Sequence, residues 1–184
     1  MQSAWKKISQ STVFKGFREI VRKRFLLPNG QESDFDIIEV PSFAAIAALT
    51  PQFEVLLVEQ FRPGPENFLL SFPEGRIDEE EEPENTAHRE LREETGFQAR
   101  EMHLLKVIPQ AYSNQLKYCF VALGCEQVAE PSLDDTEFIQ MSRWSLDEFK
   151  KLLADPRQTN FTSVDVGYLM LHFLESQALI NTNL

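Results

Sequence analysis

Apolar residues in the first half of the chain fall in short runs separated by turn residues, a pattern that is typical of β-strands. Residues 12–27 mix β-branched, aromatic and basic side chains, and residues 36–40 continue as a strand after Pro28-Asn29-Gly30. Asn and Gly accept the positive φ angles of tight hairpin turns, so we expect an N-terminal β-hairpin here. Similar apolar runs predict further strands at residues 43–49, 54–60, 68–72, 104–109 and 117–123.

Helices are predicted mainly where end signals occur. Pro83 suits a first helical position, and Gly96 suits the left-handed residue that stops a helix. Residues 145–148 have the form of a capping box, which predicts a helix to about residue 153, and a last helix is expected from residue 162 or 163. Strands and helices do not alternate regularly, so the pattern predicts an α+β fold, with layers around a mixed sheet.

The composition limits which partners the protein can bind and indicates its cellular compartment. A net charge of −11 over 184 residues argues against nonspecific binding of nucleic acid or of anionic membranes. No apolar stretch is long enough to predict a membrane span or a signal peptide. Cys119 and Cys125 lack the spacing of a metal or redox site, so we expect both to be structural and the protein to be cytoplasmic.

Basic residues gather near the start of the chain in spite of the acidic total. They could face a phosphate or an acidic partner subunit, or they could form an ordinary solvated face. The residues are Lys6, Lys7, Lys15, Arg18, Arg22, Lys23 and Arg24.

The chemistry is predicted by the acidic residues of the first helix. Glu90 and Glu94 are four apart, so their carboxylates share one helical face, and Glu93 lies beside them. Like charges are unfavourable together unless a cation lies between them, and oxygen ligands without His or Cys suit Mg²⁺ or Mn²⁺. Arg89 can pair with Glu93 or, across the loop, with Glu81. A solvated acidic helix is the alternative interpretation of these residues.

The longer segment around this helix resembles the Nudix box, G-x5-E-x7-R-E-U-x-E-E-x-G-U, in which U is apolar. All nine specified positions match, and nine matches in one window are far more specific than a short motif. They are Gly75, Glu81, Arg89, Glu90, Leu91, Glu93, Glu94, Gly96 and Phe97.

The resemblance implies a Nudix fold and a hydrolase that directs water at a diphosphate joined to a nucleoside. It implies that Glu90 and Glu94 bind Mg²⁺, with the backbone carbonyl of Glu74 as a further ligand. Glu93 is then either another ligand or the general base. In an acidic protein with an anionic substrate, the metal ions would supply the positive charge.

The surrounding chain, from about Phe17 to Phe173, is similar to ADP-ribose pyrophosphatases and other nucleoside diphosphate sugar hydrolases. Within residues 58–63, the similarity implies that Arg62 contacts the diphosphate or its ribose, which suits a planar donor fork. In residues 109–114 the chain keeps Pro, Ser and Asn, which makes Ser113 and Asn114 substrate-binding candidates. This loop lacks the usual Gly and has one extra residue.

Three further roles come from the same resemblance. Glu137 matches the carboxylate of an acidic loop and competes with Glu93 as general base. Phe17 and Phe35 match aromatic residues that sandwich the base, partly across a dimer interface, although core packing is an alternative for both. Tyr112 has the offset of a tyrosine in diadenosine polyphosphate hydrolases, so that substrate class stays open.

Together these observations predict a homodimer with an N-terminal sheet region at residues 1–40, for dimerisation and base binding, and a Nudix domain at residues 41–184. The expected reaction cuts ADP-ribose or a related nucleoside diphosphate sugar into a nucleoside monophosphate and a sugar phosphate. The alternatives are a dinucleoside polyphosphate or nucleotide hydrolase, and a Nudix-like ligand sensor without turnover. The intact box argues against the sensor.

Overall fold

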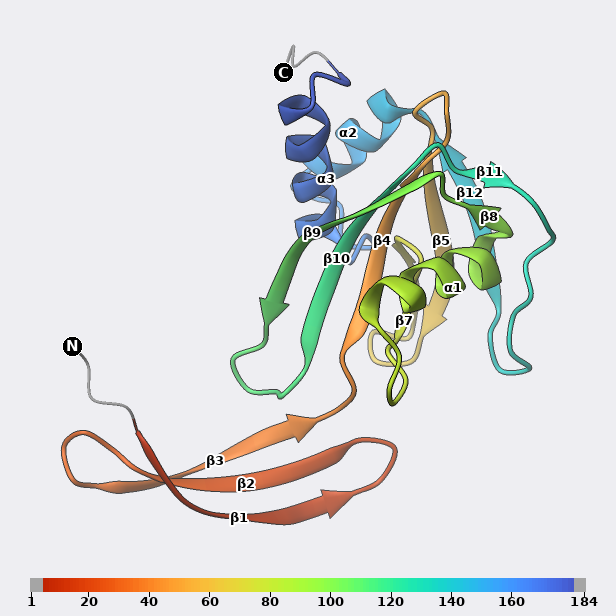
Figure 1. The fold of residues 1–184 in the computed structure, drawn as a ribbon. Coiled ribbons are helices and arrows are strands. Elements are labelled where there is room, and N and C mark those ends of the chain that lie inside the picture. The colour runs from red at the N-terminus through yellow and green to blue at the C-terminus, as the bar shows by residue number, and fades with distance from the viewer. Residues whose placement is uncertain (1–4, 181–184) are drawn as a thin grey trace. The chain divides into compact units, whose positions relative to one another are not determined.

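The computed structural model describes residues 5–180, and the chain forms two compact units (Figure 1). The N-terminal unit contains residues 5–42 together with the loop at residues 109–116. The large unit contains residues 43–108 and 117–180. Among the described residues, no helix is both long and apolar enough to cross a membrane.

The N-terminal unit is an antiparallel sheet of three strands, β1 (Lys6–Lys15), β2 (Glu19–Leu26) and β3 (Glu32–Glu39). The predicted hairpin is confirmed, because the Asn29-Gly30 turn joins β2 to β3 and Gly30 has a φ of 82°. A second turn at residues 16–18 divides the segment 12–27 between β1 and β2. Only Gly16 marks this turn in the sequence, so the break was missed.

Three of the seven basic residues near the start of the chain, all in β2, pair with acids of β3. Arg22 donates two hydrogen bonds to Asp36, at 2.8 and 3.0 Å, and Arg24 donates two to Asp34, at 2.7 and 2.9 Å. Lys23 lies 3.1 Å from a carboxylate oxygen of Glu39. Cross-strand ion pairs therefore neutralise these three cations of β2, which were candidates for binding phosphate.

The large unit is built on a mixed sheet of seven strands, which confirms the predicted α+β class. The strand order is β12-β5-β4-β10-β9, with β6 paired to β5 and β7 paired to β4. The pair β4–β10 is parallel, whereas β4–β5, β5–β6, β4–β7 and β5–β12 are antiparallel. A small ladder joins β8 to β11. The strands are β4 (Phe43–Leu49), β5 (Val55–Arg62), β6 (Asn67–Ser71), β7 (Glu74–Arg76), β8 (Phe97–Gln98), β9 (Glu101–Pro109), β10 (Leu116–Leu123), β11 (Glu126–Gln127) and β12 (Ile139–Trp144).

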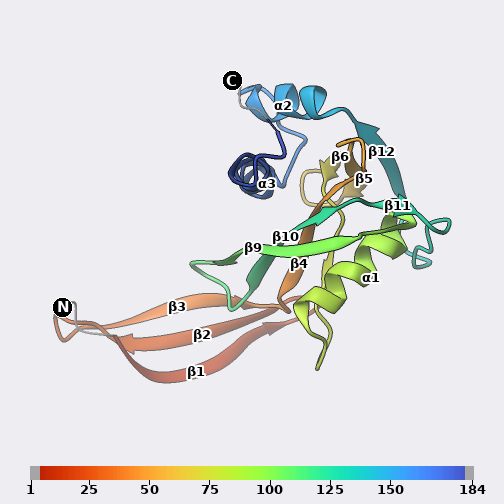
Figure 2. The same cartoon turned by 45° about the horizontal axis from the view of Figure 1, so that its top comes forward.

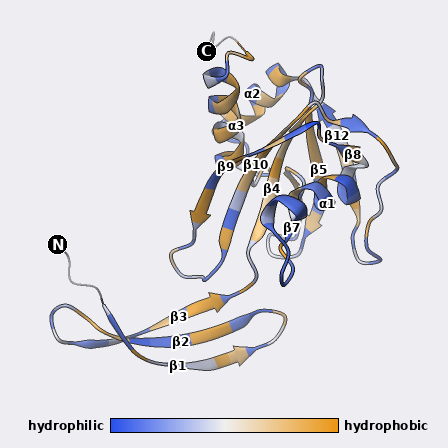
Figure 3. Ribbon diagram, in the orientation of Figure 1, coloured by the Kyte–Doolittle hydropathy of each residue, from blue (hydrophilic) through white to orange (hydrophobic). Residues whose placement is uncertain are grey.

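Helices cover both faces of this sheet, α1 (Pro83–Thr95) on one side and α2 (Leu146–Ala154) with α3 (Val164–Ser176) on the other (Figure 2). Side chains of β4 alternate between the two cores. Ala44, Ile46 and Ala48 pack with Leu91 of α1, while Ala45, Ala47 and Leu49 pack with Phe149 and Met170. Figure 3 shows the central strands coloured as hydrophobic, as expected for strands that are buried on both faces.

The helix ends agree with their sequence signals. Helix α1 begins at Pro83 and stops before Gly96, which has a φ of 76°. Ser145 and Glu148 form the predicted capping box at the start of α2, and α3 begins after Ser163. Both cysteines are free and buried, and burial raises the pKa of Cys119 to about 11 and that of Cys125 to about 12. The two thiols therefore stay protonated and belong to the core.

Candidate active site

Arg89 is the centre of the predicted cluster. The sequence allowed it to pair with Glu93 or with Glu81, and in the structure it bonds both. Its Nε and Nη2 donate to the two oxygens of Glu81, at 3.1 and 3.0 Å. Its Nη1 donates to Glu90 at 2.7 Å and to Glu93 at 3.0 Å. Nη2 also donates to the carbonyl of Arg76 at 3.1 Å, so Arg89 joins α1 to β7 and to the intervening loop.

Among these partners, Glu81 is the one that bonds Arg89 through both of its carboxylate oxygens. Its hydrogen bonds with Arg89 are the main reason why its pKa falls to about 2, and a 2.7 Å hydrogen bond from the Thr86 hydroxyl contributes further. A paired and ionised Glu81 fixes the guanidinium, and the guanidinium in turn fixes the carboxylates beside it.

Gly75 leaves the space in which the Glu90 carboxylate lies. A Cβ added to Gly75 would stand 1.8 Å from Cδ of Glu90. Strand β7 pairs with β4 at this point, with Gly75 opposite Ala44, so the backbone cannot easily retreat. The glycine of the motif is therefore needed for the close approach of a carboxylate, not for a positive φ angle.

Glu94 is the buried acid of the cluster, with 6% of its surface exposed. One of its oxygens accepts a hydrogen bond from the backbone N–H of Glu74 at 3.0 Å. Burial raises the pKa of Glu94 well above its usual value, and the charges of Glu90, Glu74 and Glu137 add to this effect. Burial likewise raises the pKa of Glu90. Neighbouring carboxylates repel one another when both are ionised, and a cation bound between them removes this cost.

The donor set fits a hard divalent cation, because it offers only carboxylate and carbonyl oxygens. Among residues 5–180, no three acidic, histidine or cysteine side chains already surround one point as a metal shell. The Glu90 and Glu93 carboxylates instead turn to Arg89. Glu90 and Glu94 are four residues apart on α1, so their side chains lie on the same face of the helix.

A second set of charges surrounds Glu74. Arg62 donates to a Glu74 side-chain oxygen at 3.0 Å, and Lys117 donates to Asp165 at 2.7 Å. Burial raises the pKa of Glu74, while the charges of Arg62 and Lys117 oppose that rise. Lys117 is 7% exposed and was missed in the sequence, although it opens the otherwise apolar run of β10.

The charge of Glu137 adds to the rise in the pKa of both Glu90 and Glu94, so this acid acts on the two metal candidates from a separate loop. A turn at residues 134–137 holds it. The backbone N–H of Glu137 donates to the Asp134 carbonyl at 2.9 Å, and the N–H of Asp134 donates to the Glu137 carboxylate at 3.3 Å.

The predicted base-binding residues lie in the N-terminal unit. Phe17 is fully exposed at the β1–β2 turn. Phe35 packs in an aromatic cluster with Trp5 and Phe25, at ring-centroid distances of 5.4 and 6.0 Å. Phe17 is therefore open to a ligand, while Phe35 already has partners within its own sheet.

The predicted substrate loop is also part of this unit, and its polar side chains bind backbone atoms of β3 and the residues after it. Ser113 Oγ donates to the Ile38 carbonyl at 2.9 Å, and Asn114 Oδ1 accepts from the N–H of Val40 at 2.9 Å. Backbone hydrogen bonds from Ile38 to Tyr112, at 3.0 Å, and from Asn114 to Ile38, at 3.2 Å, complete the attachment. Ser113 and Asn114 thus hold the loop against the sheet edge.

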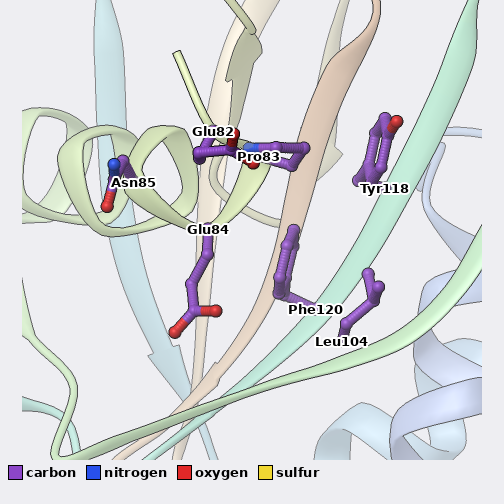
Figure 4. A pocket seen from close by; sticks show the side chains of 7 residues that line it. All are labelled: Glu82, Pro83, Glu84, Asn85, Leu104, Tyr118 and Phe120. Carbon is purple, nitrogen blue, oxygen red and sulfur yellow. The ribbon is translucent and has the colours of Figure 1, made fainter.

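A pocket of about 500 Å³ lies at the other end of α1 (Figure 4). Glu82, Pro83, Glu84 and Asn85 line it from the helix start, opposite apolar side chains of β9 and β10. None of the predicted site residues lines this pocket, so the candidate chemistry belongs to the carboxylate cluster instead. The apolar walls are formed by Leu104, Tyr118 and Phe120.

Comparison with known proteins gives a consistent picture. Residues 40–163 match the model of the NUDIX domain. The chain is 30% identical over 171 residues to the ADP-ribose pyrophosphatase of Bacillus subtilis, an alignment that covers 90% of this chain and 92% of that protein. It is 32% identical over 149 residues to the methanol dehydrogenase activator of Bacillus methanolicus, covering 79% and 80% of the two chains. A crystal structure of an ADP compounds hydrolase superposes with a TM-score of 0.83 at 23% identity, covering 98% of this chain and 99% of the other.

Proposed function

Because this chain belongs to the Nudix family, we propose that it hydrolyses the pyrophosphate bond of ADP-ribose or a related nucleoside diphosphate sugar, with Mg²⁺ bound. The family and the relatives identify a Nudix pyrophosphohydrolase of nucleoside diphosphate derivatives. The choice of a nucleotide sugar is supported by the similarity to the Bacillus subtilis ADP-ribose pyrophosphatase over nine tenths of the chain. One observation carries the proposal: Arg89, held by Glu81, gathers Glu90 and Glu93 beside the buried Glu94.

Glu90 and Glu94 would hold the metal, with the Glu74 carbonyl and Glu93 completing its ligands. The bound cation would polarise the phosphoryl oxygens and offset the charge that develops on them. The Nη1 group of Arg89 donates to both Glu90 and Glu93, so it keeps these two carboxylates close together on α1. The Gly75 cradle leaves the Glu90 carboxylate room to lie against β7.

Arg62 and Glu137 would act on the substrate itself. Arg62 keeps part of its side chain exposed while bonding Glu74, so its remaining N–H groups can donate to a diphosphate oxygen. Water attacks phosphorus, the bridging P–O bond breaks, and the displaced oxygen leaves with the second phosphate. Glu137 would take the proton that the attacking water loses. Its place on a separate loop, from which its charge raises the pKa of both Glu90 and Glu94, supports this role.

The N-terminal unit supports a proposal of its own, a homodimer in which Phe17 and Phe35 contact the base. Every residue of β1 is exposed, and four apolar side chains stand on β1 or the turn after it. An exposed apolar surface of this kind is typical of an interaction site. The four residues are Ile8, Val13, Phe14 and Phe17.

The test is an assay of nucleotide sugars, dinucleoside polyphosphates and nucleoside triphosphates with Mg²⁺, comparing kcat/KM. ADP-ribose should give AMP and ribose 5-phosphate. Glu94→Gln is the control for metal-dependent chemistry and should lower kcat by about 10²-fold or more, because it removes a ligand charge from the site. A higher kcat/KM for diadenosine tetraphosphate would show that the substrates are dinucleoside polyphosphates and not nucleotide sugars. No turnover of any compound would favour a ligand sensor.

A further inference from the structure

The C-terminal end of α1 is capped by a distant segment of the chain, residues 126–132. The backbone N–H groups of Val128 and Ala129 donate to the Gly96 carbonyl at 2.9 and 3.1 Å. The N–H of Ser132 donates to the Glu93 carbonyl at 2.8 Å. Carbonyls at a helix end have no partner within the helix, so this segment satisfies groups that water would otherwise solvate.

Gly96 is what allows the segment to come this close. A Cβ added to Gly96 would lie 2.2 Å from the carbonyl oxygen of Ala129, in addition to the cost of its left-handed φ of 76°. The ladder of β8 with β11 continues the contact, with Gln98 opposite Glu126. The segment is therefore attached to α1 through backbone atoms.

The attached segment leads directly to Glu137. Four residues lie between the last anchor, the N–H of Ser132, and this glutamate, and the turn at residues 134–137 fills most of that interval. The other end of the loop enters β12, which pairs with β5 from Ile139 onwards. The Glu137 loop is thus fixed on both sides, and its first anchor is the helix that carries Glu90 and Glu94.

We propose that the end of α1, through the Glu93 carbonyl and the close approach at Gly96, is a positioning device for Glu137. The helix then supplies the metal-binding carboxylates and also sets the distance from them to the base. This inference rests on the proposed function, in which Glu137 takes the proton of the attacking water. Ser132 and Gly96 are positioning residues, since they act through the loop and not on the substrate.

Ser132→Pro tests the device, because it removes the N–H that bonds the Glu93 carbonyl. Ser132→Ala is the matched control, since it keeps the N–H and should retain wild-type kcat. A shift of about 1 Å in a catalytic group can lower the rate roughly 10²-fold. Ser132→Pro should therefore lower kcat tenfold or more, with KM and the Mg²⁺ concentration for half-maximal rate nearly unchanged.

The double variant Ser132→Pro/Glu137→Gln separates this role from a general loss of structure. If the anchor acts through Glu137, Ser132→Pro should cause no further loss in the Glu137→Gln enzyme. Losses that multiply would overturn the positioning role. An unchanged kcat in Ser132→Pro, together with a reduced kcat in Glu137→Gln, would overturn the anchor alone. A normal kcat in Glu137→Gln would overturn the proposed role of Glu137 itself.

Gly96→Ala is a second route to the same answer if Ser132→Pro does not fold. Its control is Gly30→Ala, which has a similar φ of 82° but nothing within 4 Å of the added Cβ. Gly96→Ala should lower kcat while Gly30→Ala should not, and equal activity of the two variants would contradict the proposal.

Amide hydrogen exchange of the wild-type protein tests the same backbone contacts without any substitution. The Val128, Ala129 and Ser132 amides should be protected, and exchange at the rate of an unstructured chain would overturn the proposal.

Discussion

Gly75 and Arg89 restrain the Glu90 carboxylate together, one by leaving space and the other by donating a hydrogen bond. Gly75→Ala would place a methyl group 1.8 Å from Cδ of Glu90. We expect a fall in kcat of about 10²-fold, because a displaced metal ligand weakens charge stabilisation in the transition state. Gly64→Ala is the control, since nothing lies within 4 Å of its added Cβ. Wild-type kcat in a folded Gly75→Ala protein would contradict the cradle.

The Glu81–Arg89 pair predicts how stability depends on pH. The folded-state pKa of Glu81 is about 2, below its ordinary value of 4.5. The pair therefore stabilises the fold fully above pH 4.5, and this contribution is lost as the pH falls from 4.5 to about 2.

Glu81→Gln should lower the free energy of unfolding at pH 7 by about 1–3 kcal/mol, because Arg89 loses a charged partner in a partly buried site. The measurement is urea unfolding of both proteins between pH 7 and pH 2.5. The difference between them should shrink as the pH falls below 4.5, since protonated Glu81 no longer differs in charge from Gln. A difference that stays constant across this range would show that the ion pair does not stabilise the fold.

At the scale of helices and strands, Glu137 lies on a loop and Glu93 lies on α1, and we expect different roles for them: Glu137 as the general base and Glu93 in metal binding. Glu137→Gln should lower kcat about 10²-fold or more with little change in KM or in the Mg²⁺ requirement, as expected for a general base. Glu93→Gln removes a carboxylate that bonds Arg89 beside the metal ligands, so it should raise the Mg²⁺ concentration needed for half-maximal rate. A Mg²⁺ titration of both variants measures this. Normal kcat in Glu137→Gln would make Glu93 the better candidate.

Elements whose limits depend on local chemistry were predictable from the sequence. Pro83 and Gly96 mark the two ends of α1, and the capping box marks the start of α2. The metal-binding candidates came from the spacing of acids in one helix together with the resemblance of the longer segment to the Nudix box. Strand β12 was missed, because Ile139 follows an acidic loop and Ser142 and Arg143 interrupt the apolar pattern. Strands β7, β8 and β11 have only two or three residues each, which is too short for any periodicity.

Contacts between distant segments were not predictable in the same way. Nothing near Lys117 in the sequence indicates that it pairs with Asp165 or lies close to Glu74. The local pattern also gives no sign that Ser113 and Asn114 bond the backbone around β3, about 75 residues earlier. Such contacts depend on the topology of the sheet, which brings together strand ends far apart in the chain.

At the scale of the whole molecule, the N-terminal unit is proposed to contact the base. Phe17→Ala should raise KM more than it lowers kcat, because stacking on a base contributes about 1–3 kcal/mol, and should leave Tm unchanged since the ring is fully exposed. Phe35→Ala should raise KM but also lower Tm, because Phe35 packs against Trp5 and Phe25. Phe25→Ala is the control for loss of this cluster. If it raises KM as much as Phe35→Ala does, Phe35 belongs to the core only.

The attachment of the Ser113-Asn114 loop to β3 has a consequence for synthesis on the ribosome. Ile38 and Ser113 are 75 residues apart, so the outer edge of β3 emerges long before its partner. At translation rates of roughly 5–20 residues per second, that edge waits about 4–15 s. During this time the nascent chain presents unpaired backbone groups beside exposed apolar side chains, a combination that invites pairing with other chains. Slower translation or a higher density of ribosomes on one message should therefore increase aggregation during expression, even though the finished protein pairs this edge at Ile38.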